Sequence, residues 1–298
     1  MLRPESGVMH FVVQHDTHYR YSVPVVLAPH LLRLTPRSAD ARLISRTLLI
    51  QPQPIEQRDE LDPFGNQVTA VSFSGWSSDH LHIQSRFQLD TRVPPPLPGD
   101  GAWAMLPWPA HPNDDLLAYR LDPGGVDPGV AAFARTLASA AGHQPLAFLD
   151  HLCQTLYTRT DRQVRPTGDA QSPAETLASW RGACRDLTVL FLAAARSLGL
   201  AGRFCSGYQA AADTPDGRRH LHAWPEIFLP GLGWRGWDPT HGVPAGEGHV
   251  ALCAAPEQSA TMPVVGGYYF GSSITATLDF EVRIATSPTS AGGAVPAL

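Results

Sequence analysis

A proline- and glycine-rich segment at residues 93–101 separates two stretches of sequence that have different hydrophobic periods. Before it, short runs of apolar and β-branched residues alternate with turn residues, a pattern typical of strands. After it, apolar residues recur at helical spacing, and strand-like runs return only from Ala201 onward. One element type cannot satisfy both periods, so the sequence predicts a β-rich domain followed by an α+β domain.

The first domain is predicted at residues 1–95 as a small β-sandwich, because its short strands are separated by turn signals such as Asp62-Pro-Phe-Gly-Asn66. A Pro/Gly-rich linker is predicted at 96–126. The second domain is predicted at 127–298, with helices first and an antiparallel sheet second. The candidate strands of the first domain are 10–15, 43–50, 67–73 and 80–89, and those of the second are 203–208, 221–229, 234–239 and 274–284.

Size and charge narrow the class of protein. A chain of 298 residues, 43% of them hydrophobic, can form two globular domains with real cores. The 22 basic and 27 acidic residues give a net charge of −5 without a basic cluster, which argues against nucleic acid or anionic lipid as a partner. The N-terminus lacks an apolar stretch of signal-peptide length, and the longest apolar run, Leu187–Ala195, is too short to span a bilayer. We therefore expect a soluble cytoplasmic protein, and no pattern indicates its oligomeric state.

The four cysteines do not form a recognisable framework. Cys153, Cys184, Cys205 and Cys253 have no CxxC pair and no short regular spacing, so neither a disulfide scaffold nor a zinc ribbon is predicted. Cys205 lies in an apolar strand, and Cys153 and Cys253 have no base or acid close in sequence, so we interpret these three as core residues. No metal or cofactor is predicted.

Cys184 has a different setting, at the start of the clearest helix in the chain. Apolar residues at 187, 190, 191, 194 and 198 follow it at i, i+3, i+4, i+7 and i+11, and Gly199 is a natural stop. The free N–H groups of the first helical turn, the helix dipole and the neighbouring Arg185 would each stabilise a thiolate at this position. Cys184 is therefore the candidate nucleophile.

A predicted β-hairpin carries a candidate base and its orienting acid. His222 precedes the turn signal Pro230-Gly-Leu-Gly233, and Asp238 follows it. Side chains alternate faces along a strand, so a four-residue loop would put His222 and Asp238 on opposite faces. A loop of three or five residues, or a bulge, would bring them to one face. A Cys-His-Asp arrangement thus predicts an odd loop or a bulge.

The histidine-rich start of this hairpin allows another interpretation. His220 and His222 could bind zinc together with a cysteine, but no third ligand stands at a sequence spacing typical of zinc sites. Metal analysis of the purified protein would test this interpretation. The tryptophans at 224, 234 and 237 are interpreted as packing and shielding the hairpin.

Four motifs together resemble the transglutaminase-like superfamily of papain-type thiol enzymes. They are Gly182-x-Cys-Arg-Asp186, Gly202-Arg-Phe-x-Ser-Gly-Tyr208, His222-Ala-Trp-x-Glu226 and Gly233-Trp-x-x-x-Asp-Pro-Thr240. The first domain also resembles the β-rich domain that precedes the bacterial core of this family, through Tyr19-x-Tyr21, Pro24-Val25, Leu32-Arg-Leu-x-Pro-Arg37 and the turn at 62–66. The segment after Gly242 departs from the family's usual sequence, and we expect that departure to leave the three site residues untouched.

The resemblance implies a papain-like core in which the cysteine-bearing helix packs on an antiparallel sheet. It implies Cys184 as nucleophile, His222 as general base and acid, and Asp238 as the group that orients His222, with an acyl-enzyme intermediate and no required metal. The expected substrate is a peptide or protein amide, with hydrolysis favoured over transfer to an amine acceptor. A non-catalytic peptide-binding module is the alternative of another class. All 22 basic residues are arginine, so the chain offers no lysine amine of its own.

Overall fold

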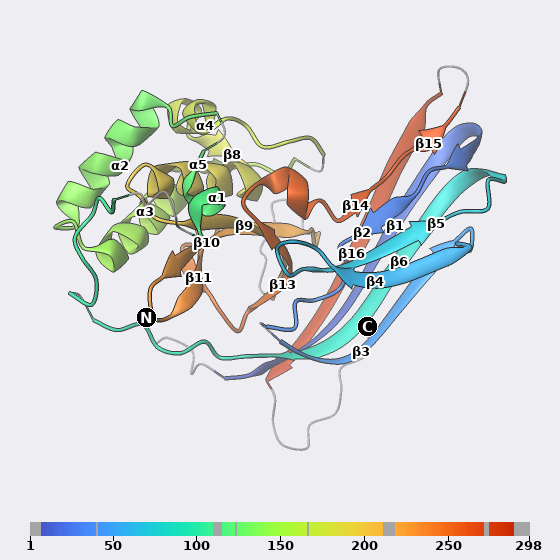
Figure 1. The fold of residues 1–298 in the computed structure, drawn as a ribbon, viewed down its shortest axis with the longest axis horizontal. Helices are drawn as coiled ribbons and strands as arrows, with labels where there is room; N and C mark the ends of the chain where they lie inside the picture. Colours follow the sequence, from blue (N-terminus) through green and yellow to red (C-terminus); the bar gives the residue numbers. More distant parts are fainter. Residues whose placement is uncertain are drawn as a thin grey trace.

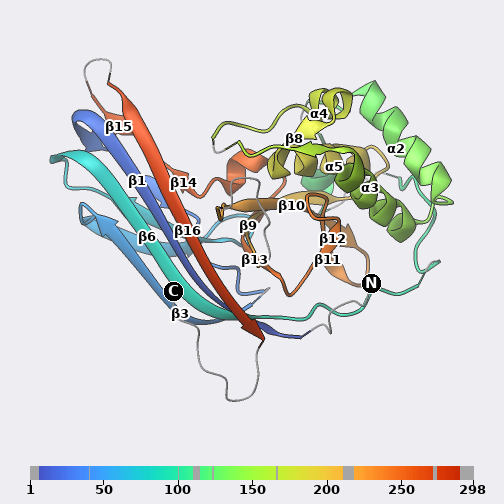
Figure 2. The ribbon, with the colours of Figure 1, turned by 180° about the vertical axis from the view of Figure 1, so that it is seen from behind.

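In the computed structural model, the first part of the chain forms two facing β-sheets and the second part packs helices on a third sheet (Figures 1 and 2). The structure describes residues 7–39, 41–99, 101–109, 115–122, 124–165, 167–210, 218–270 and 274–288. Within these ranges, no helix has both the length and the apolar character needed to cross a membrane. The α+β fold class predicted from the sequence is confirmed.

The β-sandwich predicted for the first domain is present. Its larger sheet has the order β15-β1-β6-β3, with β16 also paired to β1, and its smaller sheet has the order β14-β2-β5-β4. Along β6, alternate residues from Leu81 to Leu89 are buried, as expected for a strand with one face in a core. The strands are β1 Met9–Leu27, β2 His30–Leu32, β3 Ala41–Gln51, β4 Glu56–Leu61, β5 Gln67–Ser72, β6 Ser77–Thr91, β14 Val264–Val265, β15 Tyr268–Tyr269 and β16 Ala276–Pro288.

Several strands of the sandwich differ from the sequence prediction, since β2, β4, β14 and β15 were not predicted and β16 was assigned to the second domain. Residues 274–284 were assigned to the second domain, but β16 pairs with β1 from Met9↔Pro288 to Tyr21↔Ala276 and so belongs to the first sheet. The assignment was wrong because an alternating pattern predicts a strand without naming its partner. Strand β4 was not predicted, since all six of its residues are exposed at the sheet edge and show no apolar alternation.

The second domain packs its helices on one side of a five-stranded sheet with the order β12-β11-β10-β9-β13. Helix α5 lies against β10 and β9, and Leu187, Leu190 and Phe191 on its apolar side are fully buried. Two short parallel strands, β7 and β8, flank the start of α5. The elements are α1 Leu117–Arg120, α2 Pro128–Ala140, α3 Pro145–Arg159, β7 Asp161–Arg162, α4 Pro173–Ser179, β8 Arg181–Gly182, α5 Cys184–Arg196, β9 Gly202–Gln209, β10 His222–Leu229, β11 Gly233–Asp238, β12 Val243–Ala245, β13 His249–Ala255 and the 3-10 turn η1 Gln258–Thr261.

Parts of the predicted linker are packed rather than extended. Leu106 is buried in the core of the helical domain, and the N–H of Trp108 donates to the carbonyl of Leu198 at 2.9 Å. The short helix α1 also lies in this segment. Its apolar and aromatic residues give the segment a surface to bury, in addition to the stiffness that its prolines supply.

A buried asparagine joins the two domains. The Asn66 side chain accepts from the N–H of Ala254 at 2.8 Å and donates to the carbonyl of Ala254 at 3.0 Å, so the 62–66 turn of the sandwich is fixed to β13. The carboxylate of Asp62 accepts from the other end of the same turn and orients the amide. Tyr208 and Leu252 of the second sheet are part of the sandwich core. The second sheet therefore lies between the sandwich and the helices (Figure 1).

Replacing Asn66 with Ala should destabilise the protein by about 2–3 kcal/mol, because it leaves the buried N–H and C=O of Ala254 without partners. Urea unfolding followed by tryptophan fluorescence measures this loss. Gln57→Ala on the exposed strand β4 is the control and should change the free energy of unfolding by less than about 0.5 kcal/mol. Equal stability of the two variants would show that the Asn66 clamp does not hold the domains together.

Candidate active site

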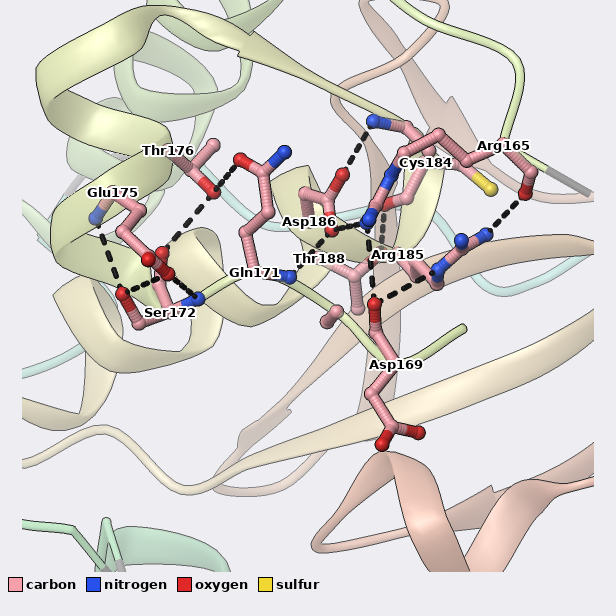
Figure 3. Close-up of polar contacts among 12 residues, drawn as sticks. Arg165, Asp169, Gln171, Ser172, Glu175, Thr176, Cys184, Arg185, Asp186 and Thr188 are labelled. Carbon is pink, nitrogen blue, oxygen red and sulfur yellow. Dashed lines mark hydrogen bonds and ion pairs between the residues drawn. The ribbon is translucent and has the colours of Figure 1, made fainter. Parts of the chain in front are cut away.

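Cys184 is the first residue of helix α5, as predicted from the sequence. The chain enters through β8 with Ala183 in an extended conformation, and the Cys184 side chain is partly exposed. In Figure 3 its sulfur points away from the polar cluster around Asp186. The other three cysteines are buried, and burial raises the pKa of Cys153, and that of Cys253 to about 12. Cys184 is thus the one cysteine placed to react with a ligand.

A buried carboxylate fixes the start of α5. Asp186 has no exposed surface, accepts the N–H of Ala183 at 2.6 Å and that of Gln171 at 2.8 Å, and forms an ion pair with Arg165 (Figure 3). A Cβ added to Gly182 would lie 2.9 Å from the Asp186 Cβ, so the close approach requires glycine. Gly182 and Asp186, the outer residues of the Gly-x-Cys-Arg-Asp motif, therefore both have structural roles: one permits the close approach, and the other fixes the start of the helix.

Arg185 ties a loop to the cysteine. Its guanidinium donates to the carbonyls of Arg165 and Thr167, each at 2.7 Å, and so holds these two residues beside Cys184. From the sequence, Arg185 was assigned only an electrostatic role. Its hydrogen bonds add a positioning role that sequence spacing does not reveal.

The hairpin that carries His222 and Asp238 has a three-residue loop. The register pairs Leu229 with Gly233 and Glu226 with Gly236, which leaves residues 230–232 as the loop. The predicted odd loop is confirmed, and both side chains lie on one face of the sheet. The Nε2 atom of His222 lies 2.9 Å from Oδ2 of Asp238, and both residues are buried. The Trp224 ring stacks beside His222 with centroids 6.0 Å apart, as expected for a shielding residue.

His222 also interacts with the Cys184 thiol, and each of the two groups shifts the pKa of the other. Because Nε2 is engaged with Asp238, Nδ1 is the ring nitrogen left to face the thiol. The three candidate residues thus lie in one series, from thiol to imidazole to carboxylate. Their geometry is in place, while their catalytic roles stay a prediction.

The electrostatics of this series favour a charge-separated pair. Burial opposes ionisation of Cys184, but the hydrogen bond and charge of His222, with smaller contributions from the Ala223 N–H and Arg185, hold the pKa of the thiol below its ordinary value. Burial likewise opposes protonation of His222, but Asp238 and Cys184 raise the pKa of the imidazole. These shifts favour the thiolate–imidazolium pair over the neutral thiol and imidazole.

Asp238 collects more donors than the sequence suggested. Its Oδ2 also contacts Nδ1 of His241 at 2.7 Å and Nε2 of His249 at 3.0 Å, and its Oδ1 accepts the N–H of Thr240 at 2.9 Å. Burial works against the charge, but these bonds and the charge of His222 hold the pKa of Asp238 well below its usual range. The carboxylate stays ionised without solvent contact.

Neither additional histidine was predicted from the sequence as part of the site. His241 stands three residues after Asp238, close enough for a turn to bring its ring to the carboxylate, so its spacing was a usable signal. His249 lies on β13, whose place in the sheet the sequence does not give. The divergent segment after Gly242 leaves the contact between His222 and Asp238 in place, and His249 of that segment adds a further contact to Asp238.

Cys184 and His222 open into a cavity of about 770 Å³ between the two domains. The second domain contributes residues around α5 and β10. The sandwich contributes side chains of β1 and β16, including Tyr19, Leu278 and Phe280. The cavity is large enough for a peptide segment, and the first domain forms part of its wall.

Two groups of three side chains among the described residues bring possible metal ligands within 4.8 Å of one another. One is Asp16, His18 and His82 on the sandwich, and the other is His222, Asp238 and His241. Neither contains the zinc set considered from sequence, which used His220 and a cysteine. Both ring nitrogens of His222 already have partners, so an ion bound there would displace the thiol or the carboxylate.

Comparison with known proteins places these features in context. Residues 11–90 match the family model of the bacterial transglutaminase-like N-terminal region, and residues 131–239 match that of the transglutaminase-like superfamily. An uncharacterized protein of Mycobacterium tuberculosis is 28% identical over 302 residues, covering 94% of each chain. An uncharacterized protein of Mycobacterium leprae is 27% identical over 283 residues, covering 91% of this chain and 97% of its own.

A crystal structure from Cytophaga hutchinsonii, of a protein proposed to be a cysteine protease, has the same fold. It superposes with a TM-score of 0.71 at 17% sequence identity, covering 96% of this chain and 93% of its own. At that identity the likeness establishes the arrangement of both domains and leaves the activity open.

Alkylation of Cys184 by iodoacetamide should persist to pH values well below the roughly 8.5 of a free thiol, since the thiolate is present at any pH above its lowered pKa. His222→Ala removes the imidazolium, so the thiol pKa rises and the rate at pH 6 should fall at least about tenfold, with the two proteins converging at alkaline pH. Intact mass and peptide mapping measure the rates. The exposed His80 supplies the control variant His80→Ala, which should behave as wild type. Equal, slow reaction of all four thiols would contradict an assembled site.

His249 should act as a positioning residue for the same series. Its Nδ1 accepts the N–H of Gly246 at 3.4 Å, so Nε2 carries the proton that Asp238 accepts, and burial keeps the pKa of His249 low. His249→Leu should slow Cys184 alkylation at pH 6 about fivefold, the equivalent of one hydrogen bond of about 1 kcal/mol. His249→Gln retains an N–H donor and should recover most of the rate. Equal rates for both variants, with unchanged melting temperature, would exclude the role.

Proposed function

The chain belongs to the transglutaminase-like superfamily, and from that premise we propose that it is a thiol hydrolase of peptide or isopeptide amides. In this proposal Cys184 is the nucleophile, His222 the general base and acid, and Asp238 the group that orients His222. The observation that carries the proposal is the position of His222 between two groups: its Nε2 lies 2.9 Å from the Asp238 carboxylate, and it interacts with the Cys184 thiol at the wall of the cavity. A histidine that only fills space in a core would not require both a thiol and a carboxylate as neighbours at the wall of a cavity.

The proposed reaction has two stages. The Cys184 thiolate adds to the amide carbonyl carbon, forming a C–S bond as the carbonyl electron pair moves to oxygen. The Cys184 N–H, in the first helical turn and without a partner inside the helix, is suited to stabilise that oxygen. When the C–N bond breaks, the His222 imidazolium gives its proton to the leaving amine, and an acyl-enzyme thioester remains.

Water completes the cycle. Neutral His222 takes a proton from a water molecule whose oxygen adds to the thioester carbonyl. The C–S bond breaks, which releases the carboxylic acid and restores the thiolate and imidazolium. Asp238 stays ionised throughout and stabilises the charged imidazole, since its pKa lies well below neutral pH.

The charges around the cavity support water rather than an amine as acceptor. Of the described residues that line it, Arg162, Arg165 and Arg185 are cationic, and Asp161 is the one carboxylate. Asp161 lies 3.2 Å from Arg181 and Arg165 is paired with Asp186, so the positive charges of Arg162 and Arg185 remain. A protonated alkylamine approaching the thioester would meet net positive charge. Amine acyl transfer remains the second candidate because the same acyl-enzyme would serve it.

Isotope labelling distinguishes the candidate activities. Wild-type protein is incubated with a peptide library in H₂¹⁸O containing cadaverine, and the products are read by mass spectrometry. Hydrolysis incorporates ¹⁸O into a new carboxyl group, and transfer adds the mass of the amine; we expect at least about tenfold more ¹⁸O product than amine adduct. The enzyme contributes no lysine amine of its own to the assay.

Cys184→Ala is the matched control, since it removes the sulfur and leaves the cavity shape intact. The ¹⁸O product should be absent with Cys184→Ala. Product formed equally by both proteins would come from a contaminant. No product from wild type, although Cys184 is selectively alkylated, would favour the non-catalytic peptide-binding module.

A further inference from the structure

The inner face of the sandwich extends beyond its own core into the catalytic cavity. Odd-numbered residues of β1 point to this face, and Phe11 and Val13 are buried in the sandwich core. Farther along the same strand, Thr17 and Tyr19 line the cavity instead. One continuous sheet face thus runs from the core of the first domain to the cavity that contains Cys184.

Strand β16 widens this face with apolar side chains. It pairs Thr17 with Phe280 and Tyr19 with Leu278, and residues directly opposite each other in an antiparallel pair share a face. Leu278 is 42% exposed although it faces the cavity, and Phe280 is only partly buried. The face therefore keeps apolar surface available to a ligand inside the cavity.

The same wall is close to the reacting groups. The rings of Phe280 and His220 lie 5.8 Å apart, and His220 is two residues from His222. Two residues of extended chain span at most about 7 Å. A peptide whose carbonyl lies at Cys184 would place a side chain one or two residues away against this wall.

His15 and Tyr208, the polar groups behind this wall, carry no charge at neutral pH. Nδ1 of His15 is 2.8 Å from the Tyr208 hydroxyl, and burial lowers the pKa of His15 to about 4. The cationic side chains that line the cavity belong to the catalytic domain. The two sides of the cavity thus differ in character, one apolar from the sandwich and one basic from the loop beside Cys184.

We propose that the β1–β16 face, formed by Tyr19, Leu278 and Phe280, is the side-chain subsite for the acyl donor. The subsite takes a bulky apolar or aromatic side chain within two residues of the bond that Cys184 attacks. This inference rests on the proposed function, and it gives the first domain a direct role in substrate selection. The substrate class is then a peptide with an aliphatic or aromatic residue beside the scissile amide.

Peptidyl acyloxymethyl ketones that differ at one residue test the subsite, because they alkylate Cys184 without requiring a known substrate. The residue beside the electrophilic one is Phe, Leu, Gly or Glu, and the second-order rate is measured by intact mass. Each rate is divided by the iodoacetamide rate of the same protein, which reports the thiolate alone. Wild type should react at least about tenfold faster with the Phe probe than with the Gly probe.

Leu278→Asp should lower the Phe-to-Gly ratio about tenfold, because a carboxylate replaces apolar surface at the subsite. Leu49→Asp is the matched control: Leu49 is 46% exposed on the outer face of the same sheet, opposite Gln84, and its variant should keep the wild-type ratio. Tyr19→Ser is a second variant that should also lower the ratio. All variants should keep the wild-type iodoacetamide rate.

Equal Phe and Gly rates in wild type would overturn the subsite while leaving the thiol enzyme intact. A ratio that Leu278→Asp and Leu49→Asp change alike would overturn it as well. If iodoacetamide fails to select Cys184 in wild type, the proposed function itself is wrong, and the subsite is rejected with it.

Discussion

The carboxylate of Asp238 is the charge around which the second domain is arranged. It has no exposed surface, so its ionised form depends on N–H donors supplied by the protein. His222, His241 and His249 meet at Oδ2, and backbone N–H groups of the following turn reach Oδ1. Those donors come from β10, from the turn after β11 and from β13, so the charge can be satisfied only when three parts of the sheet are in register. The same bonds orient His222 toward Cys184, which couples the folding of the sheet to the chemistry of the thiol.

A second constraint sets the position of the cavity. The Asn66 clamp on Ala254 and the insertion of Tyr208 and Leu252 into the sandwich core fix the second sheet against the first domain. Because β16 returns from the end of the chain to pair with β1, the sandwich face that reaches the cavity is itself completed by the last described residues. The three candidate catalytic residues lie in one domain, and part of the wall of the cavity lies in the other.

Much of the site could be predicted from local sequence. Cys184 was placed at a helix start because a helical apolar pattern follows it, and the structure begins α5 at that residue. Because side chains alternate along strands, a pair of His222 with Asp238 required a loop of three or five residues or a bulge, and a three-residue loop is observed. Contacts between distant segments were not predictable in this way. The contact of His249 was missed and β16 was assigned to the wrong domain, because a strand pattern does not specify which strand it pairs with. Arg185 was assigned only an electrostatic role, because the carbonyl groups that accept its hydrogen bonds lie about twenty residues away in the sequence.

The sequence by itself determined the type of the main elements, placed Cys184 at a helix start, and required an odd loop or a bulge if His222 and Asp238 are to share a face. These properties depend on hydrophobic period, side-chain alternation and unpaired backbone N–H groups, all of which act over a few residues. Tertiary structure alone decided that three histidines share one carboxylate oxygen, that the C-terminal strand joins the N-terminal sheet and that both domains line one cavity. The reason is physical: strand pairing and the burial of a charge are satisfied by groups that meet only in the folded chain, and many different pairings are compatible with the same local pattern.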